Sequence, residues 1–226
     1  MFENRAMFAD RSEAGGLLAR ELARFATEAP VVLALPRGGV PIGFEIARAL
    51  SAPLDIVRVR KIGAPFQPEL ALGAVVDGSS PETVINREVA EHFQIEDSYV
   101  AEAARQQLEE IERRRQLYLA NRTAAEIAGR TAIVVDDGIA TGATMEAALR
   151  ATRRRGPKRS VLATPVAPAD TIERLRPEVD EVVCLAMPQN FGAIGTFYRD
   201  FRQLSDDDVI RLLADATAFG GASSSS

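Results

Sequence analysis

The chain is poor in the side chains that form disulfides and transition-metal sites. Its 226 residues include one cysteine, Cys184, and one histidine, His92. A single cysteine excludes an intrachain disulfide framework and a multi-cysteine zinc site, and a single histidine excludes a histidine-rich metal site within one chain. Cys184 lies inside the apolar run EVVCLA, where we expect a core thiol rather than a nucleophile.

Long apolar runs and an excess of positive charge are missing as well. No stretch reaches the about 18 apolar residues of a membrane-spanning helix, and the opening MFENRAMFADRSEAGG is charged and lacks the apolar core of a secretion signal. Lys and Arg number 27 against 32 Asp and Glu, a net charge of −5, which disfavours broad electrostatic binding to nucleic acid. We therefore expect a cytoplasmic protein with no membrane or nucleic-acid partner.

What the sequence does contain is a series of short apolar runs that alternate with helical patterns. The composition, 46% hydrophobic and 26% charged, is that of a soluble globular protein. The runs occupy residues 31–35, 54–59, 132–135, 160–165 and 181–186. Such alternation predicts an α/β fold, in which a Rossmann-like parallel sheet is covered by helices on both faces.

Between the second and third runs, two segments differ from this pattern. Residues 63–69 are rich in breakers and are predicted to form a loop. Residues 86–122 form a long helical zone, with a break expected near residues 94–98.

No internal repeat and no linker divides the chain, so we predict one domain over residues 1–216. Its core is expected over about residues 30–188, with a small hood formed by residues 1–29 and 189–216. Residues 217–226, which end in GGASSSS, are predicted to be a flexible tail.

The segment AIVVDDGIATGAT, residues 132–144, joins a buried-strand pattern to two acids and a loop of small residues. Asp136 and Asp137 follow the strand, at the edge of a parallel sheet where ligands bind. The loop leads into a helical segment, so its N–H groups and the positive end of the helix dipole predict a phosphate cradle. The cradle consists of Ala140, Thr141, Gly142, Ala143 and Thr144. The two carboxylates are placed to hold the hydroxyls of a sugar that carries the phosphate.

Two cationic positions also follow predicted strands. Arg37, Gly38 and Gly39 form the turn PRGG, in which backbone N–H groups and a guanidinium can bind an anion. A plain tight turn is the alternative. Lys61 is expected at a strand end on the ligand side, either as a phosphate contact or as a solvated lysine.

The order of these features resembles that of the type I phosphoribosyltransferases. In that family an apolar strand, two acids and a small-Thr-Gly-x-Thr loop form the signature for phosphoribosyl pyrophosphate (PRPP), and this chain reads VVDDGIATGAT. The PRGG turn is similar to the family's pyrophosphate loop. With VRKIG and an aromatic C-terminal stretch, the resemblance covers nearly the whole chain and is greatest to a bacterial group of predicted phosphoribosyltransferases.

The resemblance implies transfer of the ribose 5-phosphate of PRPP to a nitrogenous base, with release of pyrophosphate. It implies Mg²⁺ as the cofactor, held directly or through water by Asp136 and Asp137, and a homodimer as the assembly. Arg37 and Lys61 join the two acids as the expected catalytic residues. The cradle and the PRGG turn are the expected substrate-binding segments.

Further details follow from the same resemblance. A non-proline cis peptide is expected at Arg37–Gly38, and a mobile closing loop over residues 62–84. In the family an aromatic side chain of the hood stacks on the base, and Phe191 or Tyr198 is the candidate. The alternative for these aromatic residues is packing in the core or in a dimer interface.

Two alternatives stay open. Relatives that act on hypoxanthine and guanine carry an acid just before the Thr-Gly of the cradle, where this chain has Ala140. A 6-oxopurine acceptor of that type is therefore disfavoured, and adenine-, uracil- and orotate-type acceptors stay open. The alternative to an enzyme is a PRPP- or nucleotide-binding regulator without turnover, because a fold does not fix a function.

Overall fold

A parallel sheet of five strands forms the centre of the molecule. The computed structural model describes residues 7–57, 59–76, 82–85, 87–119 and 124–219. The strands lie in the order β2-β1-β6-β7-β8, and every neighbouring pair is parallel. They are β1 (Pro30–Ala34), β2 (Leu54–Ile56), β6 (Thr131–Val135), β7 (Arg159–Val166) and β8 (Glu181–Ala186). The predicted α/β fold with a parallel sheet is confirmed.

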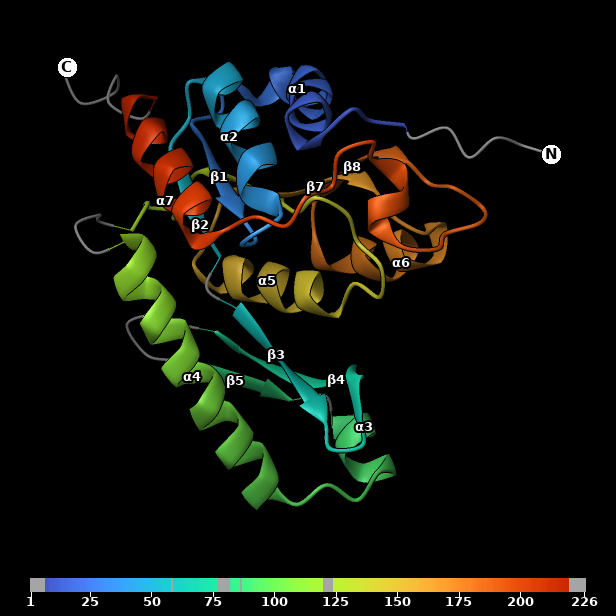
Figure 1. The fold of residues 1–226 in the computed structure, drawn as a ribbon. Helices are drawn as coiled ribbons and strands as arrows, with labels where there is room; N and C mark the ends of the chain where they lie inside the picture. Colours follow the sequence, from blue (N-terminus) through green and yellow to red (C-terminus); the bar gives the residue numbers. More distant parts are fainter. Residues whose placement is uncertain (1–6, 58, 77–81, 86, 120–123, 220–226) are drawn as a thin grey trace.

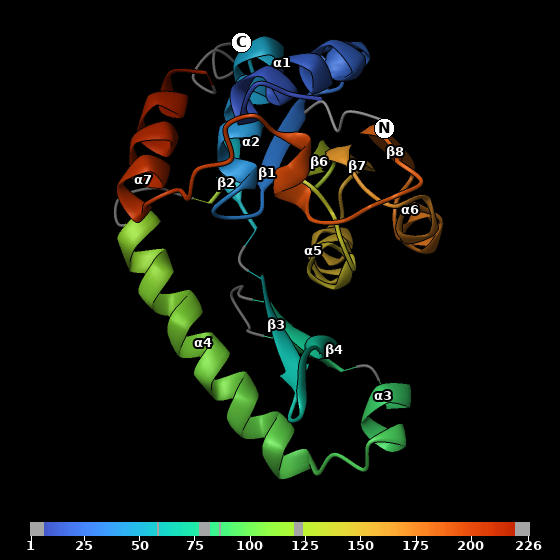
Figure 2. The same ribbon diagram turned by 45° about the vertical axis from the view of Figure 1, so that its right-hand side comes forward.

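Helices cover both faces of this sheet (Figures 1 and 2). Every residue of β1 and β6 is buried, which explains why their sequences are continuous apolar runs rather than alternating ones. Val32 of β1 packs in one hydrophobic cluster with α1, α2 and α7, and its neighbour Leu33 packs in the other with α5 and α6. The helices are α1 (Arg11–Leu22), α2 (Gly39–Leu50), α5 (Ala143–Arg154), α6 (Ala169–Leu175) and α7 (Asp206–Asp215).

A second, smaller unit is inserted between β2 and β6 and lies below α5 in Figure 1. Three antiparallel strands in the order β3-β4-β5 pack on α4 through a hydrophobic cluster that includes Ile62, Leu72 and Ile111. The elements are β3 (Val59–Ala64), β4 (Gln67–Val76), β5 (Glu82–Ile85), α3 (Arg87–His92) and α4 (Asp97–Leu119). The break predicted near residues 94–98 is confirmed by the gap between α3 and α4.

Two predictions for this region are wrong. The run 54–59 is not one strand: β2 ends at Ile56, Val57 donates its N–H to Ala34 O at 2.9 Å, and Val59 already pairs with Val76 in the other sheet. The predicted loop over 63–69 is mostly strand, since β3 runs to Ala64 and β4 starts at Gln67. Pairing with a neighbouring strand overrides the local breaker signal there.

The same strands replace most of the expected closing loop. Residues 62–64, 67–76 and 82–84 lie in the antiparallel sheet, and residues 65–66 form the turn between β3 and β4. The remainder of that prediction, residues 77–81, lies outside the described residues.

The N-terminal arm and the C-terminal stretch lie side by side. Phe8 forms a parallel bridge with Tyr198, and its N–H donates to Phe197 O at 3.0 Å. Asp200 donates its N–H to Ala9 O at 2.8 Å. These bonds join the two segments assigned to the hood, although the division of the chain into core and hood stays a prediction.

The remaining described elements are short. They are the 3-10 helices η1 (Ala23–Phe25), η2 (Arg176–Glu178), η3 (Ile194–Phe197) and η4 (Ala216–Ala218). Across the residues that the structure describes, no helix has both the length and the apolar character needed to cross a membrane.

Candidate active site

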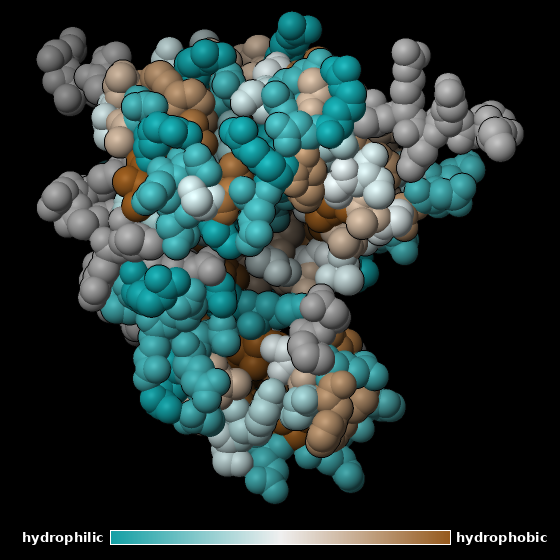
Figure 3. Space-filling model, in the orientation of Figure 1, coloured by the Kyte–Doolittle hydropathy of each residue, from teal (hydrophilic) through white to brown (hydrophobic). Residues whose placement is uncertain are grey.

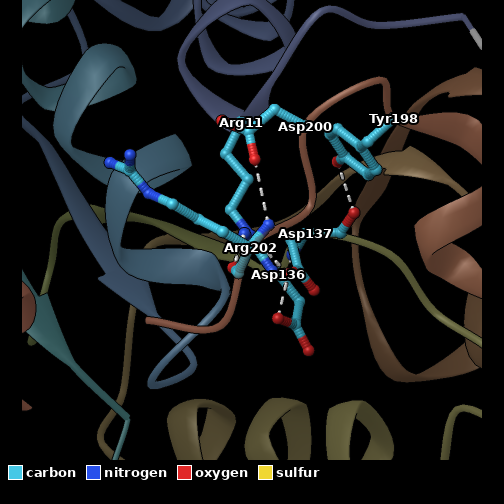
Figure 4. A network of polar contacts seen from close by, with 6 residues as sticks. All are labelled: Arg11, Asp136, Asp137, Tyr198, Asp200 and Arg202. Carbon is cyan, nitrogen blue, oxygen red and sulfur yellow. Dashed lines mark hydrogen bonds and ion pairs between the residues drawn. The ribbon is translucent and has the colours of Figure 1, made fainter. Parts of the chain in front are cut away.

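Two adjacent acids follow strand β6, and their side chains point in different directions (Figure 4). The N–H of Asp137 donates to Asp136 Oδ1 at 2.9 Å. Asp136 is half-buried and lines a cavity, whereas Asp137 is buried and its carboxylate is bound by Arg11. The two acids of the motif therefore have different surroundings.

The cavity at Asp136, here called the cradle cavity, has a volume of about 180 Å³. It is lined by Asp136, all five residues of the predicted cradle (140–144), and Lys61. The structure thus brings together three groups that the sequence singled out separately. Ile194 of η3 also lines the cavity. No local sequence pattern predicts this position, because only the fold brings Ile194 to β6.

Two side chains of α6 bind the cradle loop. Gly142 has φ +76° and immediately precedes α5, a conformation that favours glycine. Thr171 donates its hydroxyl to Ala140 O at 2.9 Å, and the Arg174 guanidinium donates to Thr141 O. Two carbonyls of the loop are therefore bound by α6, and the loop is fixed at the N-terminus of α5, where an anion is favoured.

The PRGG turn lies against the second acid. A Cβ atom at Gly38 would lie 2.1 Å from Asp137 Oδ2, so only glycine fits beneath that carboxylate. The cis peptide joins Pro36 to Arg37, one bond earlier than predicted. Arg37, within this turn, is half-buried and does not line the cradle cavity.

Arg11, at the start of α1, contacts Asp137 and the C-terminal stretch together (Figure 4). Its Nε lies 2.7 Å from Asp137 Oδ2, and each side chain is 11% exposed. Its Nη1 donates to Arg202 O at 3.0 Å, and the guanidinium lies 3.9 Å from the ring centre of Phe201. Arg11 and Asp137 are 126 residues apart, and nothing around Arg11 in the sequence signals this contact.

Tyr198 is buried and does not line the cradle cavity. Its hydroxyl donates to Asp137 O at 2.5 Å, and its ring lies 5.4 Å from Phe8 and 5.0 Å from Phe201, measured between ring centres. This packing argues against the predicted stacking of Tyr198 on a base. Phe191 is half-buried and its ring lies 5.3 Å from that of Phe197, so base stacking stays a prediction for Phe191 alone.

Burial dominates the electrostatics of the acid pair. It raises the pKa of Asp136 well above the usual carboxyl value, and the negative charge of Asp137 raises it further. Burial also raises the pKa of Asp137, against the opposing charge of Arg11. A bound cation or hydroxyl donor at Asp136 would favour its ionised form, which is the chemistry of a ligand site rather than of a structural ion pair.

Among the described residues, no group of three or more His, Cys, Asp or Glu side chains is placed to hold a metal ion. Mg²⁺ is usually bound through one or two carboxylates together with water and substrate phosphates. Asp136, which faces the cradle cavity, fits such a site. Asp137 fits less well, because Arg11 already occupies its Oδ2.

These features define a class of protein: an α/β protein with a loop of small residues at a helix N-terminus and an acid at the carboxyl end of a central parallel strand. Residues 10–202 match the phosphoribosyl transferase domain, and the chain belongs to that family.

Relatives extend this assignment. Two proteins of Mycobacterium tuberculosis, from strains CDC 1551 / Oshkosh and ATCC 25618 / H37Rv, carry the name "Putative phosphoribosyl transferase" and are 46% identical over 207 residues. The match covers 92% of this chain and 46% of each relative, so the chain spans less than half of their length. The crystal structure of TT1426 from Thermus thermophilus is 45% identical, with a TM-score of 0.82 over 95% of this chain and 99% of that one.

Proposed function

We propose that this domain transfers the ribose 5-phosphate of PRPP to a nitrogenous base and releases pyrophosphate. One observation carries the proposal: the cradle, Asp136 and Lys61 line one cavity, beside the PRGG turn. A phosphate subsite, an acid and a cation at one place match a sugar that carries a phosphate at one end and a pyrophosphate at the other.

Each part then has a role in the proposed reaction. Residues 140–144 bind the 5′-phosphate at the N-terminus of α5. Asp136 accepts hydrogen bonds from the ribose hydroxyls. Arg37, with the backbone of Gly38 and Gly39, and Lys61 bind the pyrophosphate. As the bond from C1 to the pyrophosphate breaks, the ring gains positive charge, and these fixed cations and N–H groups stabilise the negative charge on the leaving group.

Mg²⁺ fits beside Asp136 and would add positive charge on the pyrophosphate oxygens. We infer a direct role for Asp136 and a supporting one for Asp137, whose carboxylate is bound by Arg11 and whose carbonyl accepts from Tyr198. The homodimer and the cytoplasmic location stay predictions from the sequence.

Calorimetric titration with PRPP and Mg²⁺ tests the donor site. We expect micromolar binding, about −8 kcal/mol, by the wild type, and at least tenfold weaker binding by Asp136→Asn. Asp215→Asn is the matched control, because it makes the same chemical change at an exposed position on α7. Failure of the folded wild type to bind PRPP would contradict the proposal.

Pyrophosphate release with a panel of nucleobases then tests turnover. Release with one of the bases identifies the acceptor. Binding of PRPP without release across the panel would favour the regulator.

A further inference from the structure

Asp137 is fixed from three sides, although it does not line the cradle cavity. Arg11 Nε donates to Asp137 Oδ2 at 2.7 Å, and the Tyr198 hydroxyl donates to the Asp137 carbonyl at 2.5 Å. Gly38 lies against the carboxylate, where a Cβ atom would be 2.1 Å from Oδ2. The three contacts come from α1, the C-terminal stretch and the PRGG turn, so segments far apart in the sequence together set the position of Asp137.

The position of Asp137 in turn determines that of Asp136 (Figure 4). The Asp137 N–H donates to Asp136 Oδ1 at 2.9 Å, so one carboxylate oxygen of Asp136 is held by the backbone of its neighbour. Asp136 lines the cradle cavity, and a shift of the Asp137 backbone would move its carboxylate there. Arg11 and Tyr198 therefore influence the cavity although neither of them lines it.

The Arg11 guanidinium is itself held in one orientation. Its Nη1 donates to Arg202 O at 3.0 Å, and its carbon lies 3.9 Å from the ring centre of Phe201. The Phe201 ring stacks on that of Tyr198, with 5.0 Å between the ring centres. The ring also packs on Gly195, where an added Cβ would lie 2.9 Å from its nearest atom. One aromatic side chain thus contacts both donors to the acid and fixes them relative to each other.

The burial of this ion pair favours a role beyond stability. Charged side chains ordinarily lie in water, and the visible outer surface of α4 is accordingly mostly hydrophilic (Figure 3). The Arg11 and Asp137 side chains, by contrast, are each only 11% exposed. Burying two charges costs desolvation energy, and well-packed apolar residues of similar volume are often at least as stable. The contribution of the pair then lies in the fixed geometry that it gives to the neighbouring Asp136.

We propose that Arg11 is a positioning residue of the donor site. It acts through Asp137 to hold the Asp136 carboxylate where the ribose hydroxyls bind, and it does not contact the substrate itself. This inference rests on the part of the proposed function that assigns Asp136 to the ribose hydroxyls. The cradle is bound by α6 instead, so Arg11 contributes to recognition of the hydroxyls and not to recognition of the 5′-phosphate.

Ribose 5-phosphate and 2-deoxyribose 5-phosphate form a matched pair of probes, because both carry the phosphate and only the first carries the 2-hydroxyl. The wild type is expected to bind ribose 5-phosphate about tenfold more tightly, since the missing hydroxyl leaves a carboxylate without its hydrogen bond. Arg11→Met is expected to bind the two probes within about twofold of each other, because Asp136 is no longer held in place. Calorimetry or ligand-detected NMR measures both affinities. A wild type without this preference, or a folded Arg11→Met protein that keeps it, overturns the proposal.

A double-mutant cycle separates positioning from general destabilisation. Asp136→Asn is expected to remove the same preference, and adding Arg11→Met to it is expected to change the affinity for ribose 5-phosphate by less than about twofold. Arg20→Met, at an exposed position of α1, is the matched control and is expected to keep the preference of the wild type. Additive losses in the cycle overturn the proposal, because they show that Arg11 acts by a route that does not include Asp136.

A second variant covers the case in which Arg11→Met does not fold. Arg11→Met/Asp137→Asn leaves no unpaired buried carboxylate, so it is expected to be the more stable protein. It lacks the same ion pair, and the same loss of preference between the two probes is expected. A folded double variant with the preference of the wild type overturns the proposal.

PRPP titration distinguishes failure of this proposal from failure of the proposed function. A wild type that prefers ribose 5-phosphate, loses the preference in Arg11→Met and does not bind PRPP contradicts the proposed function and supports the positioning role. A wild type that binds PRPP, with the preference unchanged in folded Arg11→Met, does the reverse.

Discussion

At the scale of single residues, the main finding is that two adjacent aspartates have different surroundings. Asp136 lines the cradle cavity, and Asp137 is bound by Arg11 and Tyr198. The sequence alone does not distinguish the two acids, since both follow the same strand. The difference arises because Arg11 of α1 and Tyr198 of the C-terminal stretch form hydrogen bonds with Asp137.

The raised pKa of Asp136 predicts a cost in stability for the ligand-free protein. A carboxyl whose pKa is higher in the folded than in the unfolded state stabilises the fold below its unfolded pKa, and this contribution is lost as the pH rises through the folded pKa. Asp136→Asn should therefore raise Tm without ligand at about pH 8, with a gain that shrinks toward pH 4, near the ordinary Asp pKa of about 3.9.

Thermal unfolding of both proteins across this pH range measures the effect. A difference of about 1 kcal/mol corresponds to roughly 2–4 °C for a chain of this size. A gain in Tm that does not change with pH, or a loss at about pH 8, would contradict the prediction. The same substitution is expected to weaken PRPP binding, so stability and ligand binding oppose each other at this position.

Gly38 gives a second prediction at this scale. Because an added Cβ would lie 2.1 Å from Asp137 Oδ2, Gly38→Ala forces the carboxylate or the turn to move. We expect a loss of about 1–3 kcal/mol, the usual cost of overpacking. Gly192→Ala is the matched control, since a Cβ there meets nothing within 4 Å. Urea denaturation measures both, and equal stabilities of the two variants would contradict the clash.

At the scale of elements, Arg11 joins three segments: α1, the end of β6 and the C-terminal stretch. Arg11→Met leaves the Asp137 carboxylate buried without its cation, and we expect a loss of about 3 kcal/mol. Arg20→Met, on the exposed side of α1, should change stability by less than about 0.5 kcal/mol. Adding Asp137→Asn to Arg11→Met should recover part of the loss, because it removes the unpaired charge.

A double-mutant cycle by chemical denaturation measures this coupling. Additive losses from the two substitutions would show that Arg11 and Asp137 stabilise the fold independently, contrary to the geometry.

Elements also differ in how well the sequence predicts them. The strand β6, the loop after it and the helix α5 are encoded locally, by a buried apolar run followed by small residues at a helix start. The division of residues 54–59 between β2 and β3 is not encoded locally, and neither are the strand residues within 63–69. Both depend on pairing partners elsewhere in the chain. Of the site, the cradle and Asp136 were predictable. Arg11 and Ile194 were not, since only the three-dimensional fold brings them to β6.

At the scale of the whole molecule, two units of unequal size form the candidate site. The parallel sheet carries Asp136 and the cradle, and the smaller unit carries Lys61 on β3. The buried cluster of the smaller unit is much the smaller one among the described residues. Tyr118 of α4 donates its hydroxyl to the Asp206 carboxylate of α7, a further contact between the units.

This inequality predicts unequal protection from hydrogen exchange. Amides of β1 and β6 should exchange slowest, and those of β3 and β4 at least tenfold faster, because local opening requires less apolar surface to be exposed. Exchange followed by mass spectrometry measures each segment. PRPP should slow exchange both in the cradle and in β3. Equal protection of β1 and β3 in the free protein would contradict the prediction.

The contacts of Asp137 have a consequence for the way the protein is made. Arg11 leaves the ribosome more than a hundred residues before Asp137, and Tyr198 and Arg202 follow later still. During synthesis, the N-terminal arm therefore cannot form its pairing until the C-terminal stretch has been translated. The sheet can assemble as its strands emerge, but the acid pair acquires its final surroundings only after nearly the entire domain has been translated.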